Sequence, residues 1–294
     1  MITANETPEE LTIEFENLIK LLDDEDENIY GSIKERFISH GNPSSEFLRN
    51  YSGSENILVK KRASEIISII NFEDTEQKFL RLIERDDPDI LEEAVFLIAA
   101  MNYPGISINE YGSQLDLIAK EIDQLLKSSD IPDNINILDT LNIINEYLFF
   151  KKGYKGNEEN YYDPDNSYMN KVMDDKKGIP ITLSILYLFI TRRLGLPVYG
   201  LSLPGHFILK YADEKEEFFI DPFNKGIIIS VKDAQNFIKK IGMTDEEFKG
   251  IPYLKNSTDR EIILRVMRNL SGIYKKTGDL LRMEQIEKIM SYFV

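Results

Sequence analysis

His206 and Asp221 are the two side chains in this sequence best suited to acid–base chemistry. His206 begins the segment HFILKYA directly after a Pro-Gly turn, and Asp221 lies fifteen residues later in EFFIDPF. Both segments are rich in aromatic and β-branched residues, and the charged stretch ADEKEE separates them, which is typical of two strands joined by a solvent-facing turn. Antiparallel strands joined in this way can bring an imidazole and a carboxylate side by side on one face of a sheet.

The absence of cysteine removes several classes of chemistry. The chain has no Cys and two His, which excludes a disulfide, a thiolate nucleophile, a zinc–thiolate site, an iron–sulfur cluster and a multi-histidine metal site. Its sequence contains no phosphate-binding glycine loop, HExxH motif or EF-hand pattern. We therefore predict neither a metal nor a cofactor.

Two hydroxyls near the start of an apolar helix are candidate nucleophiles. Thr182 and Ser184 lie in the segment IPITLS. Either hydroxyl could act as a nucleophile if His206 activated it. The alternative is that both are small polar residues of a buried helix, with Thr182 bonded to a nearby backbone group.

A polar segment upstream supplies further candidates for the edge of a cleft. Asn166 and Asn170 lie in DPDNSYMN, and Tyr162 precedes them. The asparagine side chains could donate and accept hydrogen bonds at the edge of a cleft. Alternatively, Asp165 or Asn166 caps the short helix YMNKVM. Tyr162 is expected in the core or in the wall of the cleft.

One buried helix and four strands must position these side chains. The segment IPITLSILYLFITRRLGLP is apolar almost to its end, which predicts a buried helix with Pro180 in its first turn and Gly195 after its last. The segments VYGLSL, HFILKYA, EFFIDPF and GIIISV predict short strands. A buried helix followed by an antiparallel sheet makes an α+β core, which we assign to residues 151–254.

Helical regions flank this core on both sides. Residues 1–150 hold 12 basic and 31 acidic residues, against 23 and 20 in the remainder. The helix–acidic turn–helix pattern of LLDDEDENIYGSI returns about 62 residues later in LIERDDPDILEEA, which favours either a degenerate HEAT-like solenoid or an irregular bundle. Residues 255–294 predict a helix pair similar to one tetratricopeptide hairpin. It must dock on the core, because a single pair cannot bury its own apolar face.

The segments YYDPDNSYMNKVMDDKKGIPITLS, LPGHF and IDPFNKG together resemble the SirB-type proteins of the transglutaminase-like superfamily, over about residues 145–294. The resemblance implies a cysteine-protease-like core. In that core a Cys at the start of the buried helix is the nucleophile, a His on a strand is the base, and an Asp orients the His. His206 and Asp221 match the last two positions, and we predict a hydrogen bond between them. The nucleophile position falls on Pro180, which has no nucleophilic atom.

The missing nucleophile favours a non-catalytic protein that binds a peptide or protein in a degenerate cleft. The candidate cleft residues are His206, Asp221, Asn166, Asn170, Thr182 and Tyr162. The alternative is a hydrolase or amide-transferring enzyme in which His206 and Asp221 activate water or a hydroxyl.

The charge and the hydropathy pattern indicate which partners to expect. A net charge of −16 disfavours nucleic acid and anionic membranes as partners. No apolar run approaches the roughly 20 residues needed to cross a bilayer, and the N-terminal residues do not resemble a secretory signal. We expect a cytoplasmic protein that has a peptide or protein as its partner.

Overall fold

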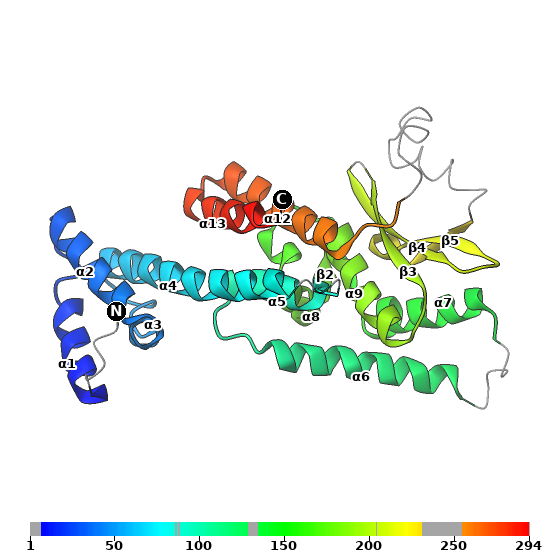
Figure 1. Ribbon diagram of the computed structural model, residues 1–294, viewed down its shortest axis with the longest axis horizontal. Coiled ribbons are helices and arrows are strands. Elements are labelled where there is room, and N and C mark those ends of the chain that lie inside the picture. The colour runs from blue at the N-terminus through cyan, green and yellow to red at the C-terminus, as the bar shows by residue number, and fades with distance from the viewer. Residues whose placement is uncertain are drawn as a thin grey trace. The chain divides into compact units, whose positions relative to one another are not determined.

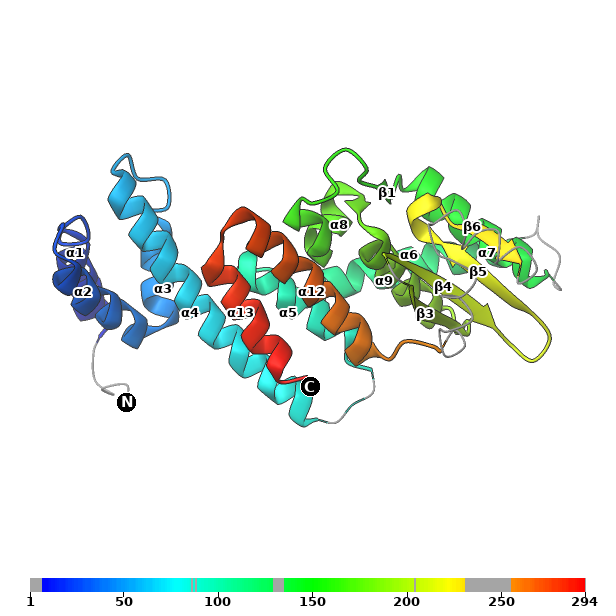
Figure 2. The ribbon, with the colours of Figure 1, turned by 90° about the horizontal axis from the view of Figure 1, so that it is seen from above.

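A computed structural model describes residues 7–85, 87, 89–128, 135–203, 205–230 and 255–293. The chain forms two compact units. The first comprises residues 1–81 and 100–104, and the second comprises residues 82–99 and 105–294. Figures 1 and 2 trace the chain from blue at its N-terminus to red at its C-terminus. Within the described ranges, no helix is long and apolar enough to cross a membrane.

The first unit consists of helices. They are α1 (Pro8–Ile19), α2 (Glu27–His40), α3 (Asn42–Arg49) and most of α4 (Ile57–Glu84). Their apolar faces meet in one core that includes Phe15, Phe37, Leu48 and Ile66. The helices α1 and α2 flank the first acidic turn as predicted, whereas α4 is one continuous helix of 28 residues. The HEAT-like repeat itself stays a prediction.

A buried arginine on α4 holds the acidic turn between α1 and α2. Arg62 is 4% exposed. Its Nη1 donates to the carbonyl oxygens of Leu22 (3.1 Å) and Asp24 (2.5 Å), and its Nη2 pairs with Glu27 (2.9 Å). The guanidinium carbon lies 4.1 Å from the centroid of the Tyr30 ring. One side chain therefore satisfies backbone carbonyls at the end of α1 and packs on an aromatic face.

The second unit includes helices that precede the expected core. Most of α5 (Leu91–Asn102) belongs to it, together with α6 (Ile108–Leu126), α7 (Ile137–Asn145) and the π-helix η1 (Glu146–Lys151). The buried residues of α6 are Leu115, Ile118, Ala119 and Ile122, and the helix packs on the later helix α9. This division differs from the domain limit at residue 150, which was expected from the change in charge. Acidic residues indicate what lies on the surface, whereas the apolar stripe of α6 determines where that helix packs.

The α+β core is confirmed. The helix α9 (Pro180–Arg193) is buried from its first residue to Thr191 and packs on the sheet. The sheet is antiparallel in the order β3-β4-β5-β6. Its strands are β3 (Val198–Leu203), β4 (His206–Ala212), β5 (Glu217–Asp221) and β6 (Ile227–Ser230). All four lie within the predicted segments, and Figure 2 shows them next to α9. Residues 231–254 of the expected core lie outside the described residues.

A polar connection leads into α9. Its elements are the strands β1 (Lys155–Gly156) and β2 (Lys177–Gly178), the 3₁₀ turn η2 (Pro164–Ser167) and the short helix α8 (Met169–Asp175). The two strands pair in parallel with each other.

The C-terminal helix pair docks on the second unit as predicted. It consists of α12 (Asp259–Thr277) and α13 (Leu280–Ser291). Gly278 joins them with a φ of 77°, a left-handed conformation that glycine adopts without strain. A hydrogen bond between the hydroxyls of Tyr168 and Tyr274 connects α12 to the segment before α8.

Candidate functional site

His206 and Asp221 are hydrogen-bonded neighbours on adjacent antiparallel strands, as predicted. Nε2 of His206 lies 3.0 Å from Oδ2 of Asp221. Because a carboxylate only accepts, Nε2 of His206 is the donor in this hydrogen bond. The Asp221 side chain is fully buried, whereas that of His206 is 11% exposed. The carboxylate therefore fixes both the tautomer and the orientation of the imidazole.

Asp221 is itself held by the loop that follows it. Its Oδ1 accepts from the backbone N–H groups of Phe223 (3.1 Å) and Asn224 (3.3 Å), and its Oδ2 accepts from Nδ2 of Asn224 (2.8 Å). These bonds cap the 3₁₀ turn η3 (Pro222–Asn224). The sequence Asp-Pro-Phe-Asn thus folds back on its own carboxylate and keeps it aimed at His206.

Gly226 closes this loop against the end of α7. Its φ is 73°, a left-handed conformation that favours glycine. Its N–H donates to the carbonyl of Asp221 (2.8 Å), and its carbonyl accepts from Nδ2 of Asn145 (2.7 Å). A Cβ at this position would lie 2.2 Å from Oδ1 of Asn145. Glycine is therefore required both by the backbone conformation and by the close approach.

We expect Gly226→Ala to lower the free energy of unfolding by about 3 kcal/mol, of which about 1 is backbone strain and about 2 is displacement of Asn145. Gly278→Ala is the matched control, because Gly278 has a φ of 77° and no atom within 4 Å of its would-be Cβ. That control should lose about 1 kcal/mol. Urea denaturation followed by far-UV circular dichroism measures both. Equal losses would show that the contact with Asn145 contributes nothing.

The start of α9 carries no available nucleophile. The helix begins at Pro180, as predicted. Thr182 is fully buried, and its hydroxyl accepts from the N–H of Ile179 (3.1 Å) and donates to the carbonyl of Asn166 (2.7 Å). Ser184 is also fully buried, and its hydroxyl has no hydrogen-bond partner among the described residues. Among the described residues, the hydrogen bonds of Thr182 go to the backbone and not to His206, so Thr182 has the backbone-bonding role.

Asn166 connects the start of α9 to the preceding loop. Its Nδ2 donates to the carbonyl of Asn160 (2.6 Å), and its Oδ1 accepts from Nδ2 of Asn157 (2.9 Å). The backbone carbonyl of Asn166 accepts from Thr182, and the residue is only 3% exposed. Asn166 therefore holds the loop that precedes α8 against the start of α9.

The prediction that Asp165 or Asn166 caps the short helix is wrong. The helix α8 begins without a side-chain cap. Asp163 instead caps η2 by accepting from the N–H of Asp165 (3.0 Å). The reason is that a 3₁₀ turn occupies the residues expected to serve as caps. Asn170 is 3% exposed, and its Oδ1 lacks a partner among the described residues.

Tyr162 ends a row of rings that starts at His206. The centroids of His206 and Phe223 are 6.4 Å apart, those of Phe223 and Tyr161 6.1 Å, and those of Tyr161 and Tyr162 5.4 Å, all edge-on. Burial raises the pKa of Tyr161, whereas Tyr162 is 65% exposed. Nζ of Lys276 lies 4.3 Å from the centroid of Tyr162. The row forms an aromatic wall beside His206.

Two adjoining hollows follow one face of α12 next to this wall. The larger, of about 600 Å³, lies between α12 and strand β3. The smaller, of about 210 Å³, lies between α12 and the residues Tyr161, Tyr162 and Ile179. Arg268 and Asn269 line both. We call the two hollows together the α12 groove. Of the six candidate cleft residues, Tyr162 alone is among the described residues that line it.

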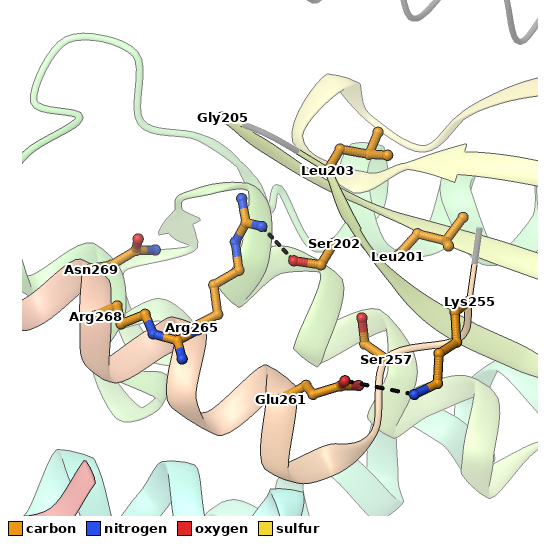
Figure 3. Close-up of a pocket in the computed structure, with 10 residues that line it drawn as sticks. All are labelled: Leu201, Ser202, Leu203, Gly205, Lys255, Ser257, Glu261, Arg265, Arg268 and Asn269. Carbon is orange, nitrogen blue, oxygen red and sulfur yellow. Dashed lines mark hydrogen bonds and ion pairs between the residues drawn. The ribbon is translucent and has the colours of Figure 1, made fainter. Parts of the chain in front are cut away.

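Arg265 is the central side chain of the larger hollow, and the sequence analysis missed it. Figure 3 shows it extending from α12 towards β3. One guanidinium nitrogen donates to the carbonyl of His206 (2.9 Å) and the other to the hydroxyl of Ser202. Burial lowers the pKa of Arg265, and the nearby charge of Arg268 lowers it further. The available signal was the spacing of Arg265 and Arg268 on one side of α12.

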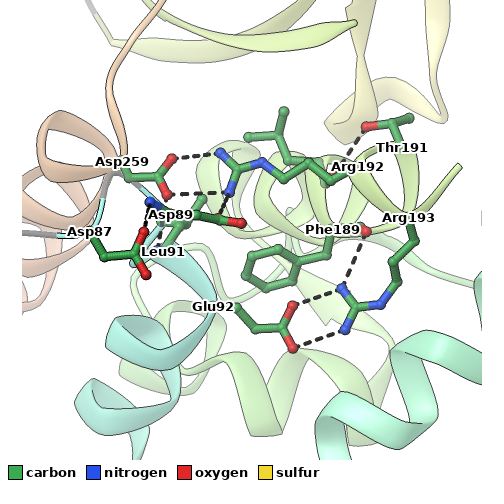
Figure 4. A network of polar contacts seen from close by, with 10 residues as sticks. Asp87, Asp89, Leu91, Glu92, Phe189, Thr191, Arg192, Arg193 and Asp259 are labelled. Atoms are coloured by element: carbon green, nitrogen blue, oxygen red, sulfur yellow. Dashed lines mark hydrogen bonds and ion pairs between the residues drawn. The ribbon is translucent and has the colours of Figure 1, made fainter. Parts of the chain in front are cut away.

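The other end of α9 is clamped by two arginines (Figure 4). Arg192 binds both carboxylate oxygens of Asp259 (2.5 and 3.2 Å), and Arg193 binds both oxygens of Glu92 (2.7 and 3.0 Å). Asp259 also accepts from the N–H of Leu91 (3.0 Å). The hydrogen bond from Arg193 to Glu92 raises the pKa of that guanidinium. This network fixes α9 to the first residues of α5 and α12, and so sets the position of the α12 groove.

The family model described as the transglutaminase-like superfamily matches residues 109–268, more than half of the chain. The chain belongs to this superfamily. The match contains Pro180, His206 and Asp221, and it also contains most of α6, which precedes the expected start of the resemblance. Within the described residues, no group of three His, Asp or Glu side chains is placed to hold a metal ion.

Curated relatives agree with this membership of the transglutaminase-like superfamily. A UPF0162 protein of Xylella fastidiosa is 32% identical over 191 residues, which is 64% of this chain and 66% of the relative. F-box only protein 21 of Homo sapiens is 26% identical over 302 residues, covering 85% of this chain and 46% of the relative. The chain thus spans slightly less than two thirds of the first relative and about half of the second. No solved structure matches.

Proposed function

We propose that the transglutaminase-like core is a non-catalytic binding module of the SirB type, which holds a peptide or protein segment in the cleft beside His206. The observation that carries this proposal is the start of α9. Its first residue is Pro180, and the hydroxyls of Thr182 and Ser184 are buried without a hydrogen bond to His206 in the described part of the chain. An oriented imidazole without a nucleophile cannot form the acyl intermediate of this superfamily.

The retained pair of His206 and Asp221 favours a second candidate, a hydrolase or amide-transferring enzyme. In this case His206 would act as the base that takes a proton from water, and the buried Asp221 would stabilise the imidazolium. We rank this candidate second, because Pro180 stands where the superfamily has its nucleophile. As part of the first proposal, we also propose that α12 and α13 form a tetratricopeptide-like hairpin and that the protein is cytoplasmic.

A paired measurement of turnover and binding separates the two candidates. Wild type and His206→Ala are incubated with pooled peptide amides and esters, and products are followed by mass spectrometry. Fluorescence anisotropy of the same peptides, labelled, gives the binding. We expect saturable binding by the wild type and no product from either protein. Product formed by the wild type and abolished in His206→Ala would overturn the binding module in favour of the enzyme.

A further inference from the structure

Three cations lie on one face of α12. They are Arg265 and the residues three and eleven positions after it, Arg268 and Lys276. This spacing places all three on the same side of a helix. All three line the α12 groove. Glu261 is the one acidic side chain that lines it among the described residues, and it is engaged in the capping box of Thr258. The groove is therefore cationic, in a chain of net charge −16.

None of these three cations is paired with a carboxylate in the described part of the chain. The two hydrogen bonds of Arg265 go to neutral oxygens, those of Ser202 and His206. Lys276 lies over the ring of Tyr162. Because Arg265 is half-buried, its charge has lost part of its hydration without gaining a counter-ion, and an incoming carboxylate would compensate it.

The arginines at the other end of α9 show the contrast. Arg192 and Arg193 each bind both oxygens of a carboxylate. The fold therefore supplies counter-ions where arginines serve its own packing, and it supplies none to Arg265. We interpret this difference as a site for an external anion.

The negative charge of the whole chain comes from acidic residues that are spread over its length, and not from residues of the groove. Charges farther away than about 8 Å are largely screened at physiological ionic strength. A carboxylate bound to Arg265 would lie at hydrogen-bond distance from its partner, where screening has little effect. The local cations therefore decide what the groove binds.

The dimensions of the groove suit a short extended chain. From Glu261 to Lys276 the helix rises about 22 Å, at about 1.5 Å per residue. An extended peptide of about six or seven residues covers this length. The smaller hollow has the apolar side chains of Ile179 and Ile273 beside Tyr161 and Tyr162, which suits one large apolar side chain.

We propose that the α12 groove binds an extended acidic peptide, with its carboxylates on Arg265 and Arg268 and one large apolar side chain in the hollow beside Tyr162. This inference rests on the proposed function and names its class of ligand. A peptide fits better than a single-stranded nucleic acid, because a nucleic acid carries a phosphate at every nucleotide and would extend the repulsion onto the acidic surface.

Anisotropy titrations of the full chain test the proposal with three labelled heptapeptides of matched length. Each contains one Phe, and the other positions are mainly Glu, Gln or Lys. We expect the Glu peptide to bind at least about tenfold more tightly than the Gln peptide. Arg265→Gln and Arg268→Gln should each weaken the Glu peptide about tenfold and leave the Gln peptide within about twofold. Arg268 makes no hydrogen bond within the described residues. Its replacement therefore removes a charge from the groove without breaking a hydrogen bond that holds the fold together.

Lys120→Gln is the matched control, because Lys120 is an exposed cation on α6 outside the groove. It should leave all three affinities unchanged. Equal binding of the Glu and Gln peptides, or an unchanged affinity in both arginine variants, would overturn the acidic ligand and leave the binding module standing. Absence of saturable binding of any of the three peptides up to about 1 mM would overturn the binding module as well. Tighter binding of oligouridylate than of the Glu peptide would replace the peptide by a nucleic acid.

Discussion

Asp259→Ala should lower the free energy of unfolding of the second unit by about 4 kcal/mol. The side chain of Asp259 is 7% exposed, and it accepts from the guanidinium of Arg192 and from the N–H of Leu91. Its removal leaves the buried N–H group of Leu91 unpaired and leaves the half-buried Arg192 with only the exposed Asp89 as its counter-ion. A buried polar group left unpaired costs about 1–3 kcal/mol, and more where it is charged. Urea denaturation followed by far-UV circular dichroism measures the loss, because the chain contains no Trp.

Asp116→Ala is the matched control for this variant. Asp116 also pairs with an arginine of α9, Arg193 (2.6 Å), but it is 69% exposed, so its removal should cost less than about 1 kcal/mol. The double replacement Arg192→Met, Asp259→Leu should recover much of the loss, since it leaves no charge unpaired. Similar losses for Asp259→Ala and Asp116→Ala would contradict the role of burial.

Arg62→Ala should destabilise the first unit by a similar amount, about 4 kcal/mol. The variant leaves the carbonyl oxygens of Leu22 and Asp24 without their donor and removes the cation from the face of Tyr30. Hydrogen exchange followed by mass spectrometry is the suitable measurement, because it reports the two units separately. Peptides from α1 and α2 should lose protection, while those from α9 should keep it.

Lys61→Ala removes the same charge from the neighbouring residue of α4, which is exposed, and should leave exchange in α1 and α2 unchanged. A loss of protection in Lys61→Ala as large as in Arg62→Ala would mean that net charge, and not the buried hydrogen bonds, stabilises the acidic turn.

The core around His206 could be predicted because its signals are local. The alternation of apolar residues sets each strand, the charged stretch sets the turn, and the proline sets the first residue of α9. Two strands joined by a short turn have few possible registers, so the pairing of His206 with Asp221 followed from their positions. Membership of the transglutaminase-like superfamily agrees with this part of the analysis.

The α12 groove could not be predicted in the same way. Arg265 reaches Ser202 and His206 across about sixty residues of sequence, and no local pattern reports such a contact. The limit expected at residue 150 likewise relied on charge, although the apolar face of α6 determines where that helix packs. Asn166 was expected at a helix end, but its partners lie in a loop whose path no propensity specifies.

The bond between Leu91 and Asp259 joins residues 168 positions apart, and this separation has a consequence for the order of folding. Contacts between distant residues form late, because the loop between them must first lose its conformational freedom. During synthesis, the sheet and α9 leave the ribosome before α12 does, and α12 supplies one whole side of the groove. The residues of the His206–Asp221 pair are therefore synthesised before the helix that completes the groove, and the groove cannot form until α12 has left the ribosome.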